Sequence, residues 1–238
     1  MSVYAQLKLT FRTVVPAPVR DAVWSKRNPV RGALLSFKGV LERSAAHDEI
    51  YDRAYYERSA DAKRVTMQHI ADSIVRDTSP RTLIDVGCGG GFLLGALAER
   101  GVTCFGLEYS RAGIELCRSA GLDVRQFDLE HDTFADGPFD VAVSMEVAEH
   151  LPASVADRFV DLLAAVAPIV VFTAARPGQV GTDHVNEQPP GYWIARFATR
   201  GFAPNEALAA SWQREWTRLG VIECYRDNLM VFSRSADS

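Results

Sequence analysis

From residue 81 onward, short apolar runs alternate with helical stretches at a nearly regular spacing. The runs predicted as strands lie at 82–86, 103–107, 123–127, 140–145 and 169–173, with helices between them at about 91–100, 110–119 and 153–166. Strand–helix alternation of this kind gives right-handed βαβ units and a parallel sheet. The runs VAVSM and IVVFT are almost continuously apolar, which is typical of strands covered on both faces.

The rest of the chain completes this fold. A long loop at 174–191 with three prolines and three glycines leads to helices at 191–200 and 206–219 and to strands at 202–205 and 228–233. We therefore predict a doubly wound, mainly parallel, seven-stranded α/β sheet of the Rossmann-like type over residues 61–238. Its first helix, at 61–77, should turn Val65, Ile70, Ile74 and Val75 inward. Residues 1–60 are predicted to form an N-terminal helical cap.

The end of the cap is rich in tyrosine. Tyr51 and Tyr55 are four residues apart and would share one helix face, and Tyr56 follows directly. Packing onto the main domain is one interpretation. The other, which we adopt as a prediction, is a lid that closes over the bound ligands and contributes these tyrosines to the acceptor site.

Composition excludes several classes of protein. The chain has 26 Lys+Arg and 30 Asp+Glu, a net charge of −4, which argues against nonspecific nucleic-acid binding. No apolar run approaches the roughly 20 residues of a membrane helix, and the first residues lack the pattern of a signal peptide. Four cysteines without a C-x-x-C pair indicate neither a zinc site nor a disulfide framework. We expect a cytoplasmic monomer or homodimer that does not bind membranes.

The glycine-rich turn after the first strand says most about function. In LIDVGCGGGFLL the strand passes through Gly87, Gly89 and Gly91 into a helix. Glycine allows a positive φ and a close approach of the backbone to a ligand, so a nucleotide is expected at this strand end. Asp85 would repel a pyrophosphate there but suits a ligand with a positive charge and no phosphate. S-adenosylmethionine, with its sulfonium and ammonium groups, is such a ligand.

Acidic residues follow the next strands at the same edge of the sheet. Glu108 lies 17 residues after Gly91, near the offset of about 20 for a ribose-binding acid, and its two oxygens can accept both ribose hydroxyls. Asp128 would accept a hydrogen bond from the adenine amino group, with Leu129 against the ring. The predicted cofactor-binding residues are Asp85, Gly87, Cys88, Gly89, Gly91, Glu108, Tyr109, Asp128, Leu129 and Met145.

On these residues the chain resembles the class I S-adenosylmethionine-dependent methyltransferases. The matching elements are LIDVGCGGGFLL, GLEYS, FDL and FDVAVSMEVAEHLP, which follow in the order of that family within residues 60–234. The resemblance implies the methyltransferase form of the Rossmann-like sheet, S-adenosylmethionine as cofactor and S-adenosylhomocysteine as product. It also implies a small-molecule acceptor, as in the natural-product members of the family.

The segment EVAEH after the fourth strand and a histidine in the long loop are candidates for the acceptor side. If a helical turn begins at Glu146, then Glu149 and His150 share its face, and His184 should reach the same edge. In one interpretation His184 or His150 accepts a proton beside Glu146, without a metal. In the other, Glu146, Glu149, His150 and His184 bind a divalent metal ion, an arrangement that resembles the small-RNA 2′-O-methyltransferases. We favour the interpretation without a metal.

The sequence thus predicts methyl transfer to a small molecule in secondary metabolism, at a hydroxyl or carboxyl oxygen. Tyr192 and Trp193 open a helix beside His184 and are further candidates for acceptor contacts, whereas Trp212 and Trp216 should pack in the core. Two alternatives stay open: a metal-assisted enzyme like the RNA 2′-O-methyltransferases, and a non-catalytic subunit that binds S-adenosylmethionine.

Overall fold

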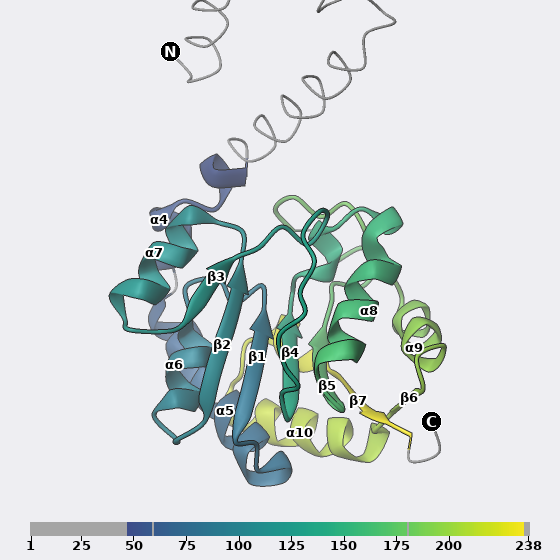
Figure 1. Cartoon of the computed structure of the whole chain (residues 1–238). Helices are drawn as coiled ribbons and strands as arrows, with labels where there is room; N and C mark the ends of the chain where they lie inside the picture. The colour runs from purple at the N-terminus through teal and green to yellow at the C-terminus, as the bar shows by residue number, and fades with distance from the viewer. Residues whose placement is uncertain (1–46, 59, 180, 236–238) are drawn as a thin grey trace, which may run out of the picture. The chain divides into compact units, whose positions relative to one another are not determined.

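One seven-stranded sheet organises the protein in the computed structural model, which describes residues 47–58, 60–179 and 181–235. The sheet belongs to the unit formed by residues 51–238. The part of the predicted N-terminal cap at 1–46 lies outside the described residues. The strand order is β3-β2-β1-β4-β5-β7-β6 (Figure 1). The strands are β1 (Thr82–Val86), β2 (Thr103–Glu108), β3 (Val124–Gln126), β4 (Val141–Met145), β5 (Ile169–Thr173), β6 (Phe202–Pro204) and β7 (Met230–Arg234).

The strand directions place a crevice at one edge of the sheet. β1 pairs in parallel with β2 on one side and with β4 on the other, so that Asp85 stands beside Gly106 and Val143. β7 runs antiparallel between β5 and β6. Because the strand order reverses between β1 and β4, ligands are expected outside the carboxyl ends of these two strands. The predicted doubly wound, mainly parallel sheet is confirmed.

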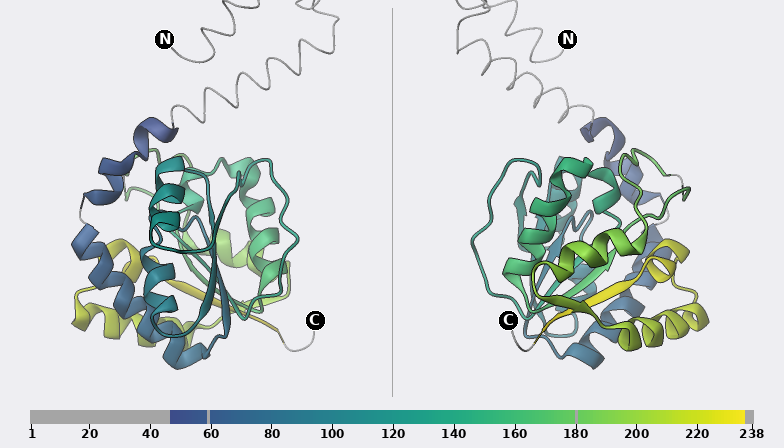
Figure 2. Two further views of the ribbon diagram at one scale, coloured as in Figure 1. Left: turned by 60° about the vertical axis from the view of Figure 1, so that its left-hand side comes forward. Right: turned by 90° about the vertical axis from the view of Figure 1, so that its right-hand side faces the viewer.

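Helices cover both faces of the sheet. α5, α6 and α10 pack on one face, and α8 and α9 on the other (Figure 2), while α7 packs against β2 and β3. The helices are α4 (Arg53–Glu57), α5 (Ala60–Thr78), α6 (Phe92–Ala98), α7 (Arg111–Ser119), α8 (Ala156–Val166), α9 (Pro190–Ala198), α10 (Glu206–Leu219) and α11 (Glu223–Asp227). Two short 3-10 helices, η1 (Ala148–His150) and η2 (Ala153–Val155), follow β4.

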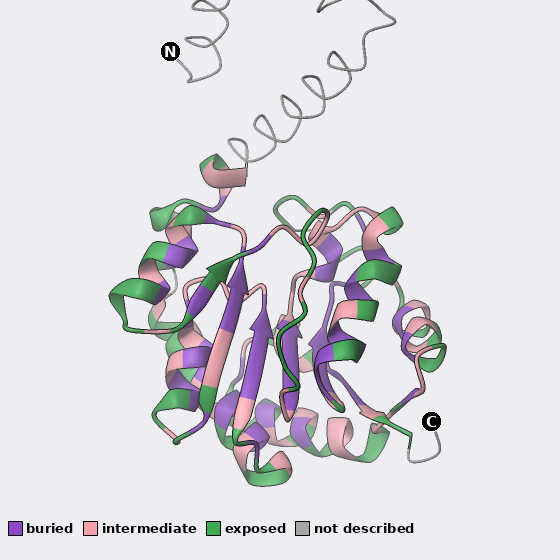
Figure 3. Ribbon diagram, in the orientation of Figure 1, coloured by how far each residue is buried: buried purple, intermediate pink, exposed green. Residues whose placement is uncertain are grey.

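The central strands are buried on both faces, as the colouring of Figure 3 shows. Their side chains alternate between two apolar layers, as the pleat of a strand requires. In β1, Leu83 joins the layer under α5, α6 and α10, and Ile84 joins the layer under α8 and α9. In β5, Val171 and Phe172 divide in the same way. This packing holds the strand ends that carry the candidate site.

The two tryptophans of α10 lie in the core, as predicted. Both are fully buried, with their rings stacked at 5.7 Å between centroids. The indole N–H of Trp216 donates to Ser73 at 2.9 Å, which gives this buried polar group its partner. The expectation for Val65 is wrong, since 57% of it is exposed. Ile70 and Ile74 are fully buried as predicted, Val75 is partly buried against the core, and Ser73 lies on the same buried side of α5.

The helix that contains Tyr55 and Tyr56 is shorter than the spacing of the tyrosines predicted. α4 begins at Arg53, and Asp52 caps it by accepting a hydrogen bond from the Tyr55 N–H at 2.8 Å. Tyr51 therefore precedes the helix, and the prediction that it shares a helix face with Tyr55 is wrong. The two rings still meet edge to face, 4.9 Å apart.

Candidate active site

The glycine turn between β1 and α6 has the conformation that only glycine adopts readily. Gly87 has φ +80°, and a Cβ there would lie 2.4 Å from the Val147 side chain. Gly89 has φ +56°, and a Cβ there would lie 3.2 Å from the Tyr56 ring. A larger residue at either position would therefore be both strained and crowded. The turn lies at the carboxyl end of β1, with the Tyr56 ring beside Gly89.

Asp85 lies at this strand end and is only 4% exposed. Burial, together with the nearby Glu108 carboxylate, raises the pKa of Asp85 to about 7. Within the described part of the chain, no hydrogen-bond donor or cation contacts this carboxyl group. A buried acid without a partner is costly, so the position suits a ligand that brings a positive charge.

Glu108, at the end of β2, anchors the glycine turn. Its Oε2 accepts from the Gly89 N–H at 2.7 Å, and its Oε1 accepts from the N–H groups of Tyr109 and Ser110 at 3.0 and 2.7 Å. Burial nevertheless raises the pKa of Glu108. A carboxylate offers about four acceptor sites, so these bonds leave one, on Oε2. The geometry supports one ribose hydroxyl at Glu108 rather than the two that the sequence suggested.

Other predicted cofactor residues line the same edge. Asp128 follows β3, and its carboxylate accepts from the Glu130 N–H at 2.8 Å and lies 2.9 Å from Nδ1 of His131. Leu129 and Met145 are partly buried at the ends of β3 and β4. The Cys88 Sγ lies 4.0 Å from that of Cys117, and the contact with Cys117, together with burial, raises the pKa of the Cys88 thiol. The predicted residues therefore lie along the carboxyl ends of the parallel strands.

Glu146 opens the acceptor side after β4. Its φ is +55°, an uncommon conformation for a residue with a side chain. Its N–H donates to the Thr173 hydroxyl at 2.9 Å, and its carboxylate accepts from the Asn228 amide at 3.1 Å. The prediction of a helical turn beginning at Glu146 is wrong, because the left-handed backbone delays the turn, η1, to Ala148.

Glu149 is fully buried within η1. Neither of its carboxylate oxygens has a well-aligned hydrogen-bond partner. Burial and the neighbouring Glu146 raise the pKa of Glu149 to about 8. Its backbone carbonyl accepts from the N–H groups of Val185 and Asn186 at 2.9 and 3.0 Å, and this attaches the long loop to η1.

The loop brings the two candidate histidines together. The rings of His150 and His184 meet edge to face, 5.0 Å apart. Potential ligand atoms of Glu149, His150 and His184 lie within 4.8 Å of one another, so three of the four residues of the metal alternative form a compact group. The sequence prediction that His184 reaches the edge beside EVAEH is thus matched by the geometry.

The tyrosines of the α4 segment contact both sides of the crevice. Tyr56 is buried beside Gly89, and the hydroxyl of Tyr51 lies 3.1 Å from Nδ1 of His150. Tyr55 packs edge to face against both rings. This arrangement agrees with a cover over the site.

Two aromatic candidates lie differently from what the sequence suggested. Trp193 is 1% exposed and packs 5.3 Å from Phe172, so its ring belongs to the core and cannot stack on an acceptor. Tyr192 is partly buried, with the Arg196 guanidinium 3.5 Å from its ring centroid.

Three residues near the site escaped sequence analysis. A carboxylate oxygen of Glu187 lies 2.9 Å from Nδ1 of His184. Glu187 follows His184 by three residues, and this spacing was the only sign of the contact in the sequence. Asn228 is buried and bonds Glu146 from a segment 82 residues away, which no local pattern indicates. Burial raises the pKa of Tyr225, and the nearby Cys224 and Glu146 add to this effect.

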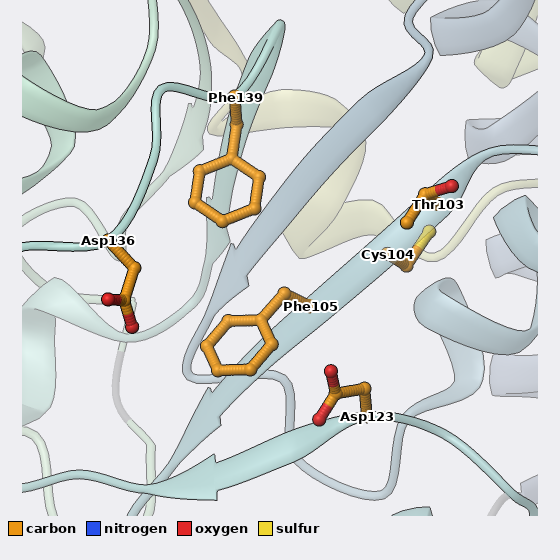
Figure 4. Close-up of a pocket in the computed structure, with 6 residues that line it drawn as sticks. All are labelled: Thr103, Cys104, Phe105, Asp123, Asp136 and Phe139. Carbon is orange, nitrogen blue, oxygen red and sulfur yellow. The ribbon is translucent and has the colours of Figure 1, made fainter.

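A separate hollow of about 290 Å³ lies at the opposite edge of the sheet (Figure 4). It surrounds the beginning of β2, whereas Glu108 ends that strand. Its lining is largely apolar, with two carboxylates at the margin: Thr103, Cys104, Phe105, Asp123, Asp136 and Phe139. We assign no function to it, because the glycine turn and the histidines lie at the other end of the strands.

Comparisons with known proteins identify a domain within the chain. Residues 84–167 match the protein family described as Methyltransferase domain. The Ubiquinone biosynthesis O-methyltransferase of Methylococcus capsulatus is 40% identical over 79 residues, which are 30% of this chain and 33% of that protein. Residues 84–167 are therefore a methyltransferase domain, in agreement with the predicted class I S-adenosylmethionine-dependent type and its cofactor. The chain spans about a third of the length of the first curated relatives it matches.

Solved structures share the fold. The magnesium protoporphyrin IX methyltransferase of Synechocystis, with bound S-adenosylhomocysteine, aligns with a TM-score of 0.55 and 16% identity over 73% of this chain and 84% of that one. A sugar N-methyltransferase from Streptoalloteichus aligns with a TM-score of 0.57 and 17% identity over 77% and 93%. Among the described residues, no helix is long and apolar enough to span a bilayer.

Proposed function

We propose that this methyltransferase transfers the methyl group of S-adenosylmethionine to an oxygen of a small-molecule acceptor in a biosynthetic pathway of secondary metabolism. The observation that carries the proposal is the juxtaposition of two sets of groups along one edge of the sheet. Buried acids and the glycine turn follow β1 and β2, and two imidazoles beside Glu149 follow β4 and β5. A cofactor held by the first set would present its methyl group toward the second.

The residues present fit S-adenosylmethionine. The unpartnered, buried Asp85 would face the ammonium group, since a positive charge relieves the cost of burying this carboxylate. The remaining acceptor site on Glu108 would take a ribose hydroxyl, and Asp128 the adenine amino group. The cofactor, when bound, supplies a methyl carbon activated by a sulfonium, and the residues around it supply alignment and a site without water.

The acceptor side favours a hydroxyl over a carboxyl group. A hydroxyl must lose its proton as the new C–O bond forms, and His184 and His150 are the groups that can accept it. A carboxylate acceptor needs no base, so it would give the two imidazoles no part in the reaction. The curated relatives are named Ubiquinone biosynthesis O-methyltransferase, and this name also supports an oxygen acceptor in biosynthesis. The acidic net charge gives no support to RNA as the acceptor.

Calorimetric titration with S-adenosylhomocysteine tests the cofactor half of the proposal. Glu108→Ala should weaken binding, because one charged hydrogen bond contributes about 1.5–3 kcal/mol and the glycine turn also loses its anchor. Glu115→Ala, an exposed change on α7, is the matched control and should bind as the wild type does. Wild-type affinity in a folded Glu108→Ala variant would remove Glu108 from the site.

The acceptor half is tested with S-adenosylmethionine carrying a ¹³C-labelled methyl group. The protein is incubated with a panel of phenols, sugar alcohols, carboxylic acids and amines, and the products are read by carbon NMR, which separates O-methyl from N-methyl signals. We expect O-methyl signals from hydroxyl compounds. Methylation of the amines alone would contradict the proposal.

A further inference from the structure

Ser110 connects the tyrosine segment, residues 51–58, to the acid at the end of β2. It is fully buried at the start of α7. Its N–H donates to Oε1 of Glu108 at 2.7 Å, and its hydroxyl donates to the backbone carbonyl of Tyr51 at 2.9 Å. One residue therefore holds Glu108 on one side and the tyrosine segment on the other.

The hydroxyl of Ser110 makes two different contacts. Besides donating to Tyr51, it accepts from the Gly113 N–H at 3.2 Å and so caps α7. A hydroxyl has one proton and two lone pairs, so the two contacts do not compete. The cap needs only the oxygen, whereas the contact with Tyr51 needs the proton. The contact with Tyr51 is therefore additional to the ordinary role of a serine at the start of a helix.

A second residue of the tyrosine segment reaches another partner of Glu108. The ring of Tyr56 is buried so close to the glycine turn that a Cβ on Gly89 would lie 3.2 Å from it. The N–H of the same Gly89 donates to Oε2 of Glu108 at 2.7 Å. The segment thus contacts, at two separate points, residues that the Glu108 carboxylate itself holds.

The side chain of Tyr51 extends to the acceptor side. Its hydroxyl lies 3.1 Å from Nδ1 of His150, while its backbone carbonyl accepts from Ser110. Tyr51 is only 8% exposed, so no bulk water is at hand to replace a hydrogen bond that breaks here. Tyr51 therefore extends from the cofactor side of the site to the acceptor side, and Ser110 fixes its backbone.

We propose that Ser110 is a positioning residue that fastens the tyrosine segment to Glu108, so that the bound cofactor and the closed segment stabilise each other. The proposal rests on the proposed cofactor pose, with a ribose hydroxyl at Glu108. A ligand that fixes the Glu108 carboxylate also fixes its partners Ser110 and Gly89, and the segment that packs on both then opens less often. The closed segment keeps water away from the methyl transfer.

Hydrogen exchange of backbone amides, read by mass spectrometry, tests this link without an acceptor. The N–H groups of Tyr55 and Arg58 are hydrogen-bonded within the segment, so their exchange reports its opening. In the wild type, saturating S-adenosylhomocysteine should slow this exchange about fivefold. In Ser110→Ala the exchange without ligand should be about fivefold faster than in the wild type, because one buried hydrogen bond is lost. The ligand should then slow it little, because the connection to Glu108 is cut.

Two further variants separate the contact with Tyr51 from the loss of a helix cap. Ser110→Thr keeps the hydroxyl and should exchange as the wild type does, with the same response to the ligand. Asn205→Ala removes the cap of α10, where the Asn205 side chain accepts from the Leu208 N–H at 3.1 Å. This control loses a comparable cap far from the tyrosine segment along the chain, and exchange of the segment should not change.

Three results would overturn the proposal. The first is wild-type exchange of the segment that bound S-adenosylhomocysteine leaves unchanged, and this result does not depend on any variant folding. The second is a folded Ser110→Ala protein with wild-type exchange or with an undiminished response to the ligand. The third is a folded Ser110→Thr protein that behaves like Ser110→Ala. Failure of the proposed function is distinguishable, because calorimetry would then show no binding of S-adenosylhomocysteine to the wild type. The comparison of Ser110→Ala with the wild type without ligand would still report whether Ser110 holds the segment.

Discussion

Asp85 gives the sharpest quantitative prediction. Its pKa lies near 7 in the folded protein against an ordinary value of 3.8. Between these pH values the folded protein keeps a proton that the unfolded chain has lost, so the free energy of unfolding falls as the pH rises through this window. At 1.36 kcal/mol per pH unit, the ionisation of Asp85 lowers stability by up to about 4 kcal/mol between pH 4 and pH 8.

Substitution by asparagine isolates this contribution. Asp85→Asn keeps the shape of the side chain but cannot ionise, so other titrating groups cancel when the two proteins are compared. Chemical denaturation without ligand, from pH 4 to pH 8, measures both free energies of unfolding. The free energy of unfolding of the variant minus that of the wild type should increase by up to about 4 kcal/mol as the pH rises. A constant difference across this range would refute the burial argument for Asp85.

Ligand binding should reverse the effect of burial on Asp85. An ammonium group beside the carboxylate favours its charged form, so binding releases the proton that the free protein holds. The affinity for S-adenosylhomocysteine should therefore rise between pH 5 and pH 7, by up to about tenfold per pH unit. Asp85→Asn should bind weakly and without this dependence. Equal pH dependence in both proteins would mean that the ammonium lies elsewhere.

Three further predictions concern the turn, the histidines and the cover. Gly89→Val should abolish calorimetric binding of S-adenosylhomocysteine while circular dichroism stays native, because a branched side chain at φ +56° intrudes on the cofactor; retained binding would place the cofactor elsewhere. Chelator should leave methyl transfer unchanged if His184 acts as a base, whereas loss of transfer and its restoration by Mg²⁺ or Mn²⁺ would favour metal ligation by Glu149, His150 and His184. Deletion of residues 1–58 should spare much of the cofactor affinity and remove turnover, since water then enters the site; full turnover in the truncated protein would refute the lid.

The sheet and its crevice were predictable because their signals are local. Each of these strands is a short apolar run, and Asp85, Glu108 and Asp128 lie at or just after the end of such a run, so parallel topology alone brings them to one edge. The glycine turn is readable for the same reason, since its positive φ angles demand glycine in the sequence.

The sequence predictions were wrong where contacts with distant segments determine burial, backbone conformation or hydrogen bonding. Val65 fits the helical period of Ile70 and Ile74, but it is exposed because no other element of the described structure covers it. Glu146 has no local signal for its left-handed backbone, which the Thr173 hydroxyl and the Asn228 amide stabilise from distant segments. The sequence suggested that both carboxylate oxygens of Glu108 are available to the ribose. Three backbone N–H groups occupy most of their acceptor sites, and these N–H groups reach Glu108 only in the folded protein.

The acceptor side was predictable in its members but not in their roles. The sequence places His150 beside Glu149 and brings a loop histidine to the same edge. It does not show that Nδ1 of His184 meets the carboxylate of Glu187. That contact depends on how the loop lies against η1, through the backbone bonds of Val185 and Asn186.

A crystal structure of the complex with S-adenosylhomocysteine tests the central claim most directly. We predict the adenosine beside Glu108 and Asp128, the ammonium group at Asp85, and the sulfur directed toward the side of the crevice that holds Glu149 and His184. Such a pose would leave the transferred methyl group facing the imidazole pair. A ligand bound away from the glycine turn, or one whose sulfur points away from the histidines, would contradict the account.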